Sequence, residues 1–191
     1  MDLTTRVKSI LLQPAQEWRK IAAESTDVGA LLSDYAGPLS AVSALCGWIG
    51  GSLIGYGFVR VGLVRGFANA VVTWVFGLVG CWLAAMVIER LAPTFGSRGN
   101  TAQALKLVVY ASTPVWIAGV LRLIPPLTTL SLIAALYGLY LFYIGLPAVM
   151  HTPADKVIPY MAVSAVAVIL VVIVFGFFAS AITGVGQMAA F

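Results

Sequence analysis

Charged and metal-binding residues are scarce in this sequence. Only 9% of the 191 residues are charged, and the chain has one histidine and two cysteines. A soluble domain carries about 25% charged residues, so this composition excludes an ordinary soluble domain. His151, Cys46 and Cys81 lie far apart and lack the neighbouring ligands that a zinc site needs. Because 61% of the residues are hydrophobic, the composition predicts an integral membrane protein.

Motifs for catalysis and for nucleic-acid binding are also missing. The sequence has no P-loop, no dinucleotide fingerprint and no His-Glu metalloprotease motif, and we predict neither a metal nor a cofactor. The net charge of +4 is not arranged as a basic stripe with aromatic residues, which argues against a nucleic-acid partner. Asp155 follows His151 by four residues, so one isolated His/Asp pair is conceivable, although a solvated loop histidine is the simpler interpretation.

Five long apolar stretches are present instead. Each is close to the 20 residues that a helix needs to cross about 30 Å of hydrocarbon. Backbone groups in lipid must be satisfied within the segment, so the stretches are predicted to be helices. The sequence therefore predicts an all-α, polytopic membrane protein with five transmembrane helices after a leader of residues 1–34. The spans cover residues 35–58, 66–88, 103–121, 126–150 and 158–183.

The distribution of Lys and Arg predicts the orientation. The leader and the connections after spans two and four carry eight of these residues, and the opposite side carries three. The positive-inside rule then places the N-terminus in the cytoplasm and, with five spans, the C-terminus outside. No cleavable signal peptide precedes the first span, which we expect to act as the targeting signal.

The leader has an amphipathic pattern interrupted by Pro14. Proline suits the first turn of a helix, so we predict two short helices at about 3–12 and 14–24. They are expected to lie on the cytoplasmic membrane surface, with Trp18, Arg19 and Lys20 at headgroup depth. The alternative is a pair of helices that pack on the protein's own loops.

Rows of small residues at four-residue intervals predict close helix packing. We expect spans one and two to contact each other through their rows. The row of span five predicts either packing within the chain or a face for a homo-oligomer. The rows are Ser43, Gly47, Gly51 and Gly55 in span one, Thr73, Gly77, Cys81 and Ala85 in span two, and Gly176, Ser180 and Gly184 in span five.

Span three contains the segment Tyr110-Ala111-Ser112-Thr113-Pro114. Pro114 removes a backbone donor and is predicted to kink the helix. A packing kink is the default interpretation, and a broken-helix substrate site is the alternative.

The stretch "SDYAGPL" stands at the start of span one. Asp34 is suited to cap the helix, Pro38 to its first turn, Gly37 to a close approach, and Tyr35 to the membrane interface. These residues either form a boundary device or belong to a docking site on the cytoplasmic face.

"SDYAGPL" also resembles the Asp-Leu-x-Gly-Pro-Leu signature of the Yip family, the Ypt/Rab-GTPase-interacting membrane proteins. "YASTPVW", "YGLYLFYIGL" and "LLQPAQEWRKIAAE" are similar to other segments of that family, in the same order. The family has leucine where Tyr35 stands, and the short leader is typical of a prokaryotic member. The resemblance implies five spans, a cytoplasmic N-terminus and a membrane module without established chemistry.

The sequence as a whole favours a non-enzymatic membrane scaffold or adaptor in a bacterial inner membrane. It would act through contacts with the lipid bilayer and with a protein partner or a second copy of itself. A small transporter, a channel or an accessory subunit is the first alternative, motivated by the irregular span three. A membrane enzyme is the second.

Overall fold

The computed structural model describes residues 2–25, 27–55 and 60–183, with the side chains of these residues except 125 and 179–183. Every regular element among these residues is helical. Five helical segments are long and apolar enough to cross a membrane, which confirms the all-α fold with five spans. They are Val28–Ile54, Leu63–Phe95, Thr101–Leu123, Pro126–Met150 and Ala154–Phe178.

The leader forms the two predicted helices, α1 (Leu3–Leu12) and α2 (Pro14–Ala23). Pro14 occupies the first turn of α2, where its missing N–H has no intrahelical partner to lose. Gln13 between the helices has a non-helical backbone and turns the chain.

The first span begins at Val28, seven residues before the start that the apolar pattern predicts. Asp27 makes this earlier start possible, because its carboxylate accepts a hydrogen bond from the Ala30 N–H and caps the helix. The span ends at Gly55, whose φ of 80° favours glycine. Its consecutive segments are α3 (Val28–Ala30), a π-helical turn (Leu31–Ala36), α4 (Gly37–Ile49) and a second π-helical turn (Gly50–Ile54).

The remaining four spans are long helices with short 3₁₀ extensions. Asn100 and Gln103 form a capping box at the start of span three. The helix of span three continues past Pro114 to Ala118. The elements are α5 (Leu63–Leu91) and Ala92–Phe95, α6 (Thr101–Ala118) and Gly119–Leu123, Pro125–Leu130 and α7 (Ser131–Met150), and Ala154–Lys156 and α8 (Val157–Thr183).

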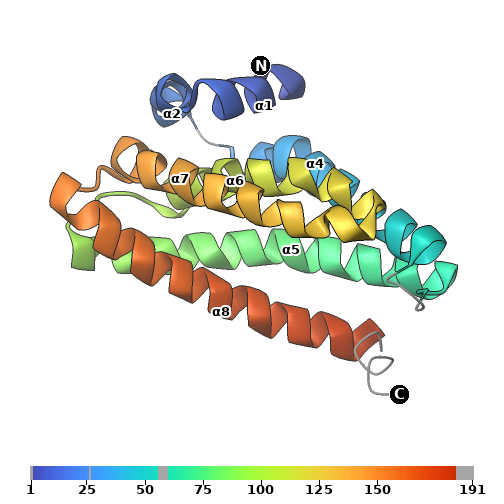
Figure 1. Cartoon of the computed structure of the whole chain (residues 1–191). Coiled ribbons are helices and arrows are strands. Elements are labelled where there is room, and N and C mark those ends of the chain that lie inside the picture. The colour runs from blue at the N-terminus through green and yellow to red at the C-terminus, as the bar shows by residue number, and fades with distance from the viewer. Residues whose placement is uncertain (1, 26, 56–59, 184–191) are drawn as a thin grey trace.

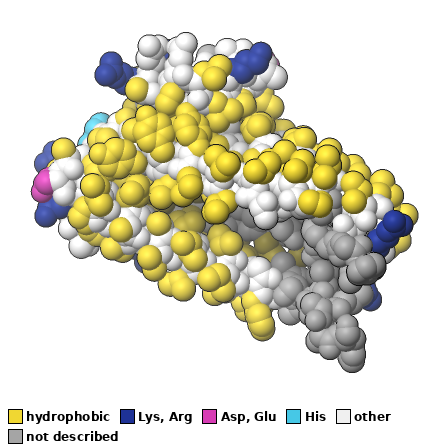
Figure 2. Space-filling view, viewed as in Figure 1, with side chains coloured by type: hydrophobic (Ala, Val, Ile, Leu, Met, Phe, Trp, Pro, Cys, Tyr) yellow, Lys and Arg dark blue, Asp and Glu magenta, His cyan; other side chains and the backbone are white. Residues whose placement is uncertain are grey.

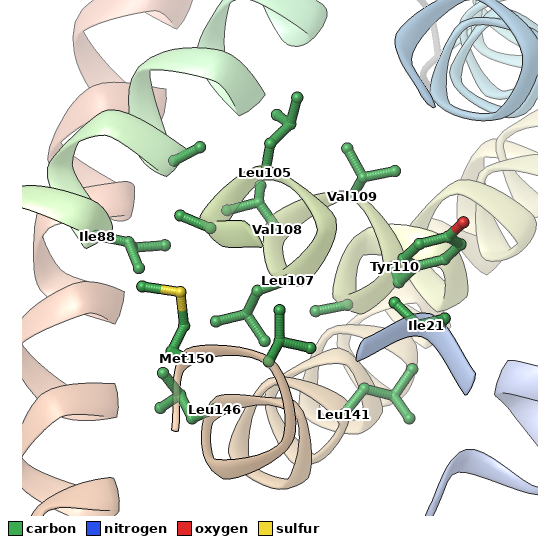
Figure 3. Packing of buried hydrophobic residues seen from close by; sticks show 14 of the residues in the cluster. Ile21, Ile88, Leu105, Leu107, Val108, Val109, Tyr110, Leu141, Leu146 and Met150 are labelled. Carbon is green, nitrogen blue, oxygen red and sulfur yellow. The ribbon is translucent and has the colours of Figure 1, made fainter. Parts of the chain in front are cut away.

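Span three is the central helix of the bundle. Its most apolar window is 61% buried, against 6% for the last span. Figure 1 shows the leader and α7 on one side of the bundle, with α5 and α8 on the other. In Figure 3, Leu105, Leu107 and Val109 of α6 lie among side chains from its neighbours, including Ile88 of α5 and Leu146 of α7. The core is therefore built around α6.

Hydrophobic side chains cover most of the long flank of the bundle, as Figure 2 shows. Lys and Arg side chains gather on the leader and at the two ends of the bundle. This distribution suits a bundle whose middle lies in hydrocarbon and whose ends reach water.

Two connections meet at one end of the bundle, the connection from α5 to α6 and the connection from α7 to α8. The Ser97 hydroxyl donates to Thr152 Oγ1 at 2.9 Å, and the Arg98 N–H donates to the Met150 carbonyl at 2.9 Å. The leader lies along the flank of α6 and α7, and the C-terminal end of α2 contacts Lys106 toward this end, which we call the leader end. His151 is exposed there with φ 51°, and the neighbouring Asp155 contacts Lys156 at 3.7 Å. His151 and Asp155 make no hydrogen bond with each other, so the conceivable pair does not form.

The prediction that the small-residue rows of spans one and two face each other is wrong. The row of span one faces the outer end of span three. An added Cβ at Gly119 would lie 1.9 Å from Ser43 Oγ, and one at Gly47 would lie 3.5 Å from Arg122 Cδ. Gly51 is buried and its carbonyl accepts from the Val61 N–H, while Gly55 follows the last turn of the span with a φ of 80°. The side of span one that faces span two carries Ser40 and Trp48 instead.

The row of span two lines a hollow of about 330 Å³ between α5, α6 and α8. Thr73, Gly77 and Cys81 line it together with Gly176 of α8, and nothing lies within 4 Å of a Cβ added at Gly77 or Gly176. Ala85, at the end of the row, is fully buried. The Ser180 side chain and Gly184 lie outside the described part of the chain. The small residues at these positions leave a space between the helices and do not bring the helices into close contact.

Candidate functional site

Lys106 of α6 joins the leader to the spans. Its side chain is 5% exposed, and its ammonium donates to the carbonyls of Ile21 at 2.8 Å and Glu24 at 2.5 Å. These carbonyls lie at the C-terminal end of α2, where unpaired acceptors and the helix dipole favour a cation. The sequence signal was a lysine close to the end of an apolar run, which normally indicates an interfacial residue. The structure shows that it caps a second helix.

Arg6 of α1 holds the two leader helices together. It is 7% exposed, and its guanidinium lies 2.6 Å from the carboxylates of both Glu17 and Glu24. Burial opposes the charge of Arg6, but the hydrogen bond to Glu24 and the nearby negative charges outweigh burial and raise its pKa above the ordinary value. Breaking a buried pair leaves an uncompensated charge, so this cluster fixes the shape of the leader.

The leader packs on the protein, so the Trp18 ring does not lie on the membrane surface as predicted. Trp18 is 1% exposed, and its ring meets Tyr110 edge-on with centroids 6.1 Å apart. Gly145 of α7 leaves the room for it, since an added Cβ there would lie 2.8 Å from the Trp18 ring. Arg19 and Lys20 are exposed beside it. An amphipathic helix needs an apolar surface, and here α6 and α7 supply it.

Tyr35 and Gly37 are two buried residues of the "SDYAGPL" motif, and we call them its inward half. The Tyr35 side chain is buried, its hydroxyl shares a hydrogen bond with Thr113 Oγ1 at 2.9 Å, and its ring lies 4.7 Å from that of Tyr110. Gly37 is also buried, and its carbonyl accepts from Trp74 Nε1 at 3.1 Å. These two motif residues attach span one to spans two and three.

Asp34 and Pro38 are the outward half of the motif, and both are exposed. The prediction that Asp34 caps the helix is wrong, because Asp27 performs that role and Asp34 lies within the π-helical turn. The Asp34 carboxylate accepts a hydrogen bond from the Ser33 hydroxyl at 2.6 Å. Pro38 has no N–H to donate toward the Asp34 carbonyl, so the regular helical ladder is interrupted at the motif.

A pocket of about 250 Å³ lies where the leader meets the motif. Its lining combines buried cations, exposed carboxylates and apolar side chains, which makes it the best candidate for a binding site. The lining residues are Leu3, Arg6, Glu24, Ser25, Asp27, Ala30, Leu31, Asp34, Tyr35, Lys106 and Tyr110. Among the residues that the structure describes, no group of three or more His, Cys, Asp or Glu could hold a metal ion.

The residues next to Pro114 make internal contacts. Thr113 is fully buried against Tyr35, and the Ser112 hydroxyl donates to the Val108 carbonyl of its own helix at 2.8 Å. Tyr110 lines the pocket at the leader and Ser112 lines the hollow between α5, α6 and α8, so these two residues face different spaces.

The motif, the first four spans and most of the fifth span lie within a segment that matches a family model. That model, the Yip1 domain, covers residues 8–176. The chain belongs to the Yip1 domain family. Residues of the leader, the motif and all five spans fall inside the Yip1 match.

Two relatives of this Yip1 protein are both named inner membrane protein YohC. They come from Escherichia coli strain K12 and from E. coli O6:H1 strain CFT073, and each is 23% identical over 160 residues. The alignment covers 80% of this chain and 82% of each relative. No solved structure matches the chain. This Yip1 protein is therefore a membrane protein, with relatives assigned to a bacterial inner membrane.

Proposed function

We propose that this protein is a non-enzymatic membrane scaffold or adaptor that acts through protein or lipid contacts at its leader end. One observation carries the proposal: the leader is docked on the spans through Lys106, and this leaves the outward half of the motif exposed on a prebuilt surface. A docked leader presents a fixed surface to a partner, so little ordering entropy opposes binding. The partners are lipid together with a second protein or a second copy of the chain.

The exposed charges of the leader end support this role. Lys8, Arg19 and Lys20 project from the leader, and Asp34 from the motif. Arg98 and Asp155 are exposed on the two connections. The only buried ion pair among the described residues, Arg6 with Glu17, serves the internal structure of the leader. The mixed exposed charge provides electrostatic complementarity for a partner without providing a reactive group.

Replacing Asp34 by alanine tests the proposal. We expect the free energy of unfolding to change by less than about 0.5 kcal/mol, as for most exposed positions. Retention of a co-purifying component in mild detergent should fall by about tenfold, equivalent to about 1.4 kcal/mol. The measurement compares the amount of the same component that wild type and variant retain.

Asp155→Ala is the matched control, because Asp155 is an exposed carboxylate of the leader end outside the motif. It should retain the component as wild type does. Wild-type protein that stays monomeric and retains no protein or lipid would contradict the scaffold proposal.

We further propose that the leader end faces the cytoplasm of a bacterial cell, with the protein in the inner membrane. The excess of Lys and Arg at this end supports that orientation. His151→Cys should react with a membrane-impermeant maleimide only after the cells are opened. Thr129→Cys, exposed at the opposite end, should react in intact cells. The reverse pattern would overturn the orientation.

The transporter alternative has weaker support. Thr113, next to Pro114, is buried against Tyr35. The Ser112 hydroxyl donates to its own helix. Ser112 also lines the hollow between α5, α6 and α8, whose lining is mostly apolar.

A further inference from the structure

Two buried cations line the floor of the pocket at the leader. Arg6 and Lys106 are both more than nine-tenths buried, and the Glu24 carboxylate, which also lines the pocket, pairs with Arg6. Lys106 uses two of the three N–H donors of its ammonium on backbone carbonyls. Arg6 binds Glu17 and Glu24 through its two terminal nitrogens, which leaves its Nε–H outside those contacts. Glu17 and Glu24 balance the charge of Arg6, so the third ammonium donor of Lys106 is the main donor that the floor keeps for an anionic group.

The rim of the pocket is acidic. Asp27 and Asp34 line it with exposed side chains. Asp27 accepts from the Ala30 N–H and Asp34 from the Ser33 hydroxyl, and neither takes part in an ion pair with a described residue. A carboxylate in this situation favours a cationic group close by.

The remaining wall is apolar, and the pocket lies at headgroup depth. Leu3, Ala30 and Leu31 form this wall. Lys106 and Arg122 are sixteen positions apart on span three, which is about 24 Å at the rise of a helix. A hydrocarbon core is about 30 Å thick, so the two residues lie within a few ångströms of its two edges. The pocket around Lys106 thus lies at the edge of one leaflet.

From this arrangement we propose that the pocket binds the headgroup of a zwitterionic phospholipid that carries a primary ammonium, a phosphoethanolamine headgroup. The ammonium is held by Asp34 and Asp27 at the rim. The phosphate is held by the Lys106 ammonium at the floor, with the Arg6 Nε–H as a further donor. The apolar wall of Leu3 and Leu31 leads the acyl chains back to the bilayer. This inference rests on the proposed function, because it names the lipid class that Asp34, in the outward half of the motif, would contact.

The charges of the site exclude the other common headgroups. A phosphoglycerol headgroup carries no cation, and the two carboxylates of the rim repel it. A choline headgroup has no N–H to donate to Asp27 or Asp34. It would need open aromatic faces, but the rings of Tyr35 and Tyr110 pack on each other and Arg6 lies over Tyr110.

The test uses the purified full chain with phosphatidylethanolamine, phosphatidylglycerol and phosphatidylcholine of identical acyl chains, in equal amounts, and native mass spectrometry. The ethanolamine lipid should bind at least about tenfold better than the other two, a difference of about 1.4 kcal/mol. Soluble O-phosphoethanolamine should compete for the site, which would identify the headgroup as the recognised part. Equal binding of the three lipids, or a preference for phosphatidylglycerol, would overturn the inference.

The variant for this test is Asp34→Asn combined with Asp27→Ser. Serine keeps the helix cap of α3 while it removes the charge, so the first span retains its start. The preference for the ethanolamine lipid should be lost. Asp155→Asn removes a carboxylate outside the pocket and should keep the preference. A preference that persists in the double variant would also overturn the inference.

Retention of a protein partner is measured separately, in membranes without ethanolamine lipid. Retention without any lipid preference would reject the headgroup site and leave the scaffold proposal intact. A lipid preference without retained protein would support the headgroup site and confine the scaffold role to lipid contacts.

Discussion

Gly50→Ala is expected to be the most destabilising single substitution. A Cβ at this position would lie 1.9 Å from the Arg122 carbonyl oxygen and 3.0 Å from its carbonyl carbon. These are backbone atoms of the outer end of span three, so no side-chain rotation can relieve the clash. Overpacking of this kind costs about 3 kcal/mol or more, which exceeds the gain of about 1 kcal/mol from the helix propensity of alanine. The unfolding midpoint in detergent measures the effect.

Gly77→Ala is the matched control. Gly77 also lies in a membrane-spanning helix, but nothing lies within 4 Å of its added Cβ. Alanine should therefore leave stability unchanged or raise it by up to about 1 kcal/mol. Equal effects of the two substitutions would show that spans one and three do not approach each other at Gly50.

Lys106→Met is expected to release the leader from the spans. Methionine fills a similar volume but leaves the carbonyls of Ile21 and Glu24 without their donor. Each unsatisfied buried acceptor costs about 1–3 kcal/mol, so the docked state should lose about 3 kcal/mol. Since 1.4 kcal/mol corresponds to tenfold, the undocked population should rise by about a hundredfold.

Limited trypsin digestion measures this release, because the peptide bonds after Arg19 and Lys20 lie within α2 and are cut when the helix opens. Cleavage at these bonds should be much faster in Lys106→Met than in wild type. Lys156→Met, at an exposed position of the same end, should cleave as wild type does. Wild-type cleavage rates in Lys106→Met would show that the leader is held by its apolar contacts alone.

Both predictions depend on span three, which the sequence presents as one apolar stretch among five. Its buried position follows from contacts along most of its surface, with α5, α7, the first span and the leader. Gly119 and Gly145 allow two of these contacts at close range. The composition of a single helix does not indicate how many neighbours surround it.

The sequence by itself determined the five helical spans and the two leader helices. Membrane thickness sets the length of a span, and Pro14 sets the division of the leader, so both features are local. Tertiary structure decided which surface each apolar face covers. Trp18 contacts α6 and α7 instead of lipid, the row of span one contacts span three, and Asp27 replaces Asp34 as the cap. The physical reason is that lipid hydrocarbon and a protein interior are similarly apolar. Periodicity can therefore identify an apolar face, but only the packing of the other helices decides what covers it.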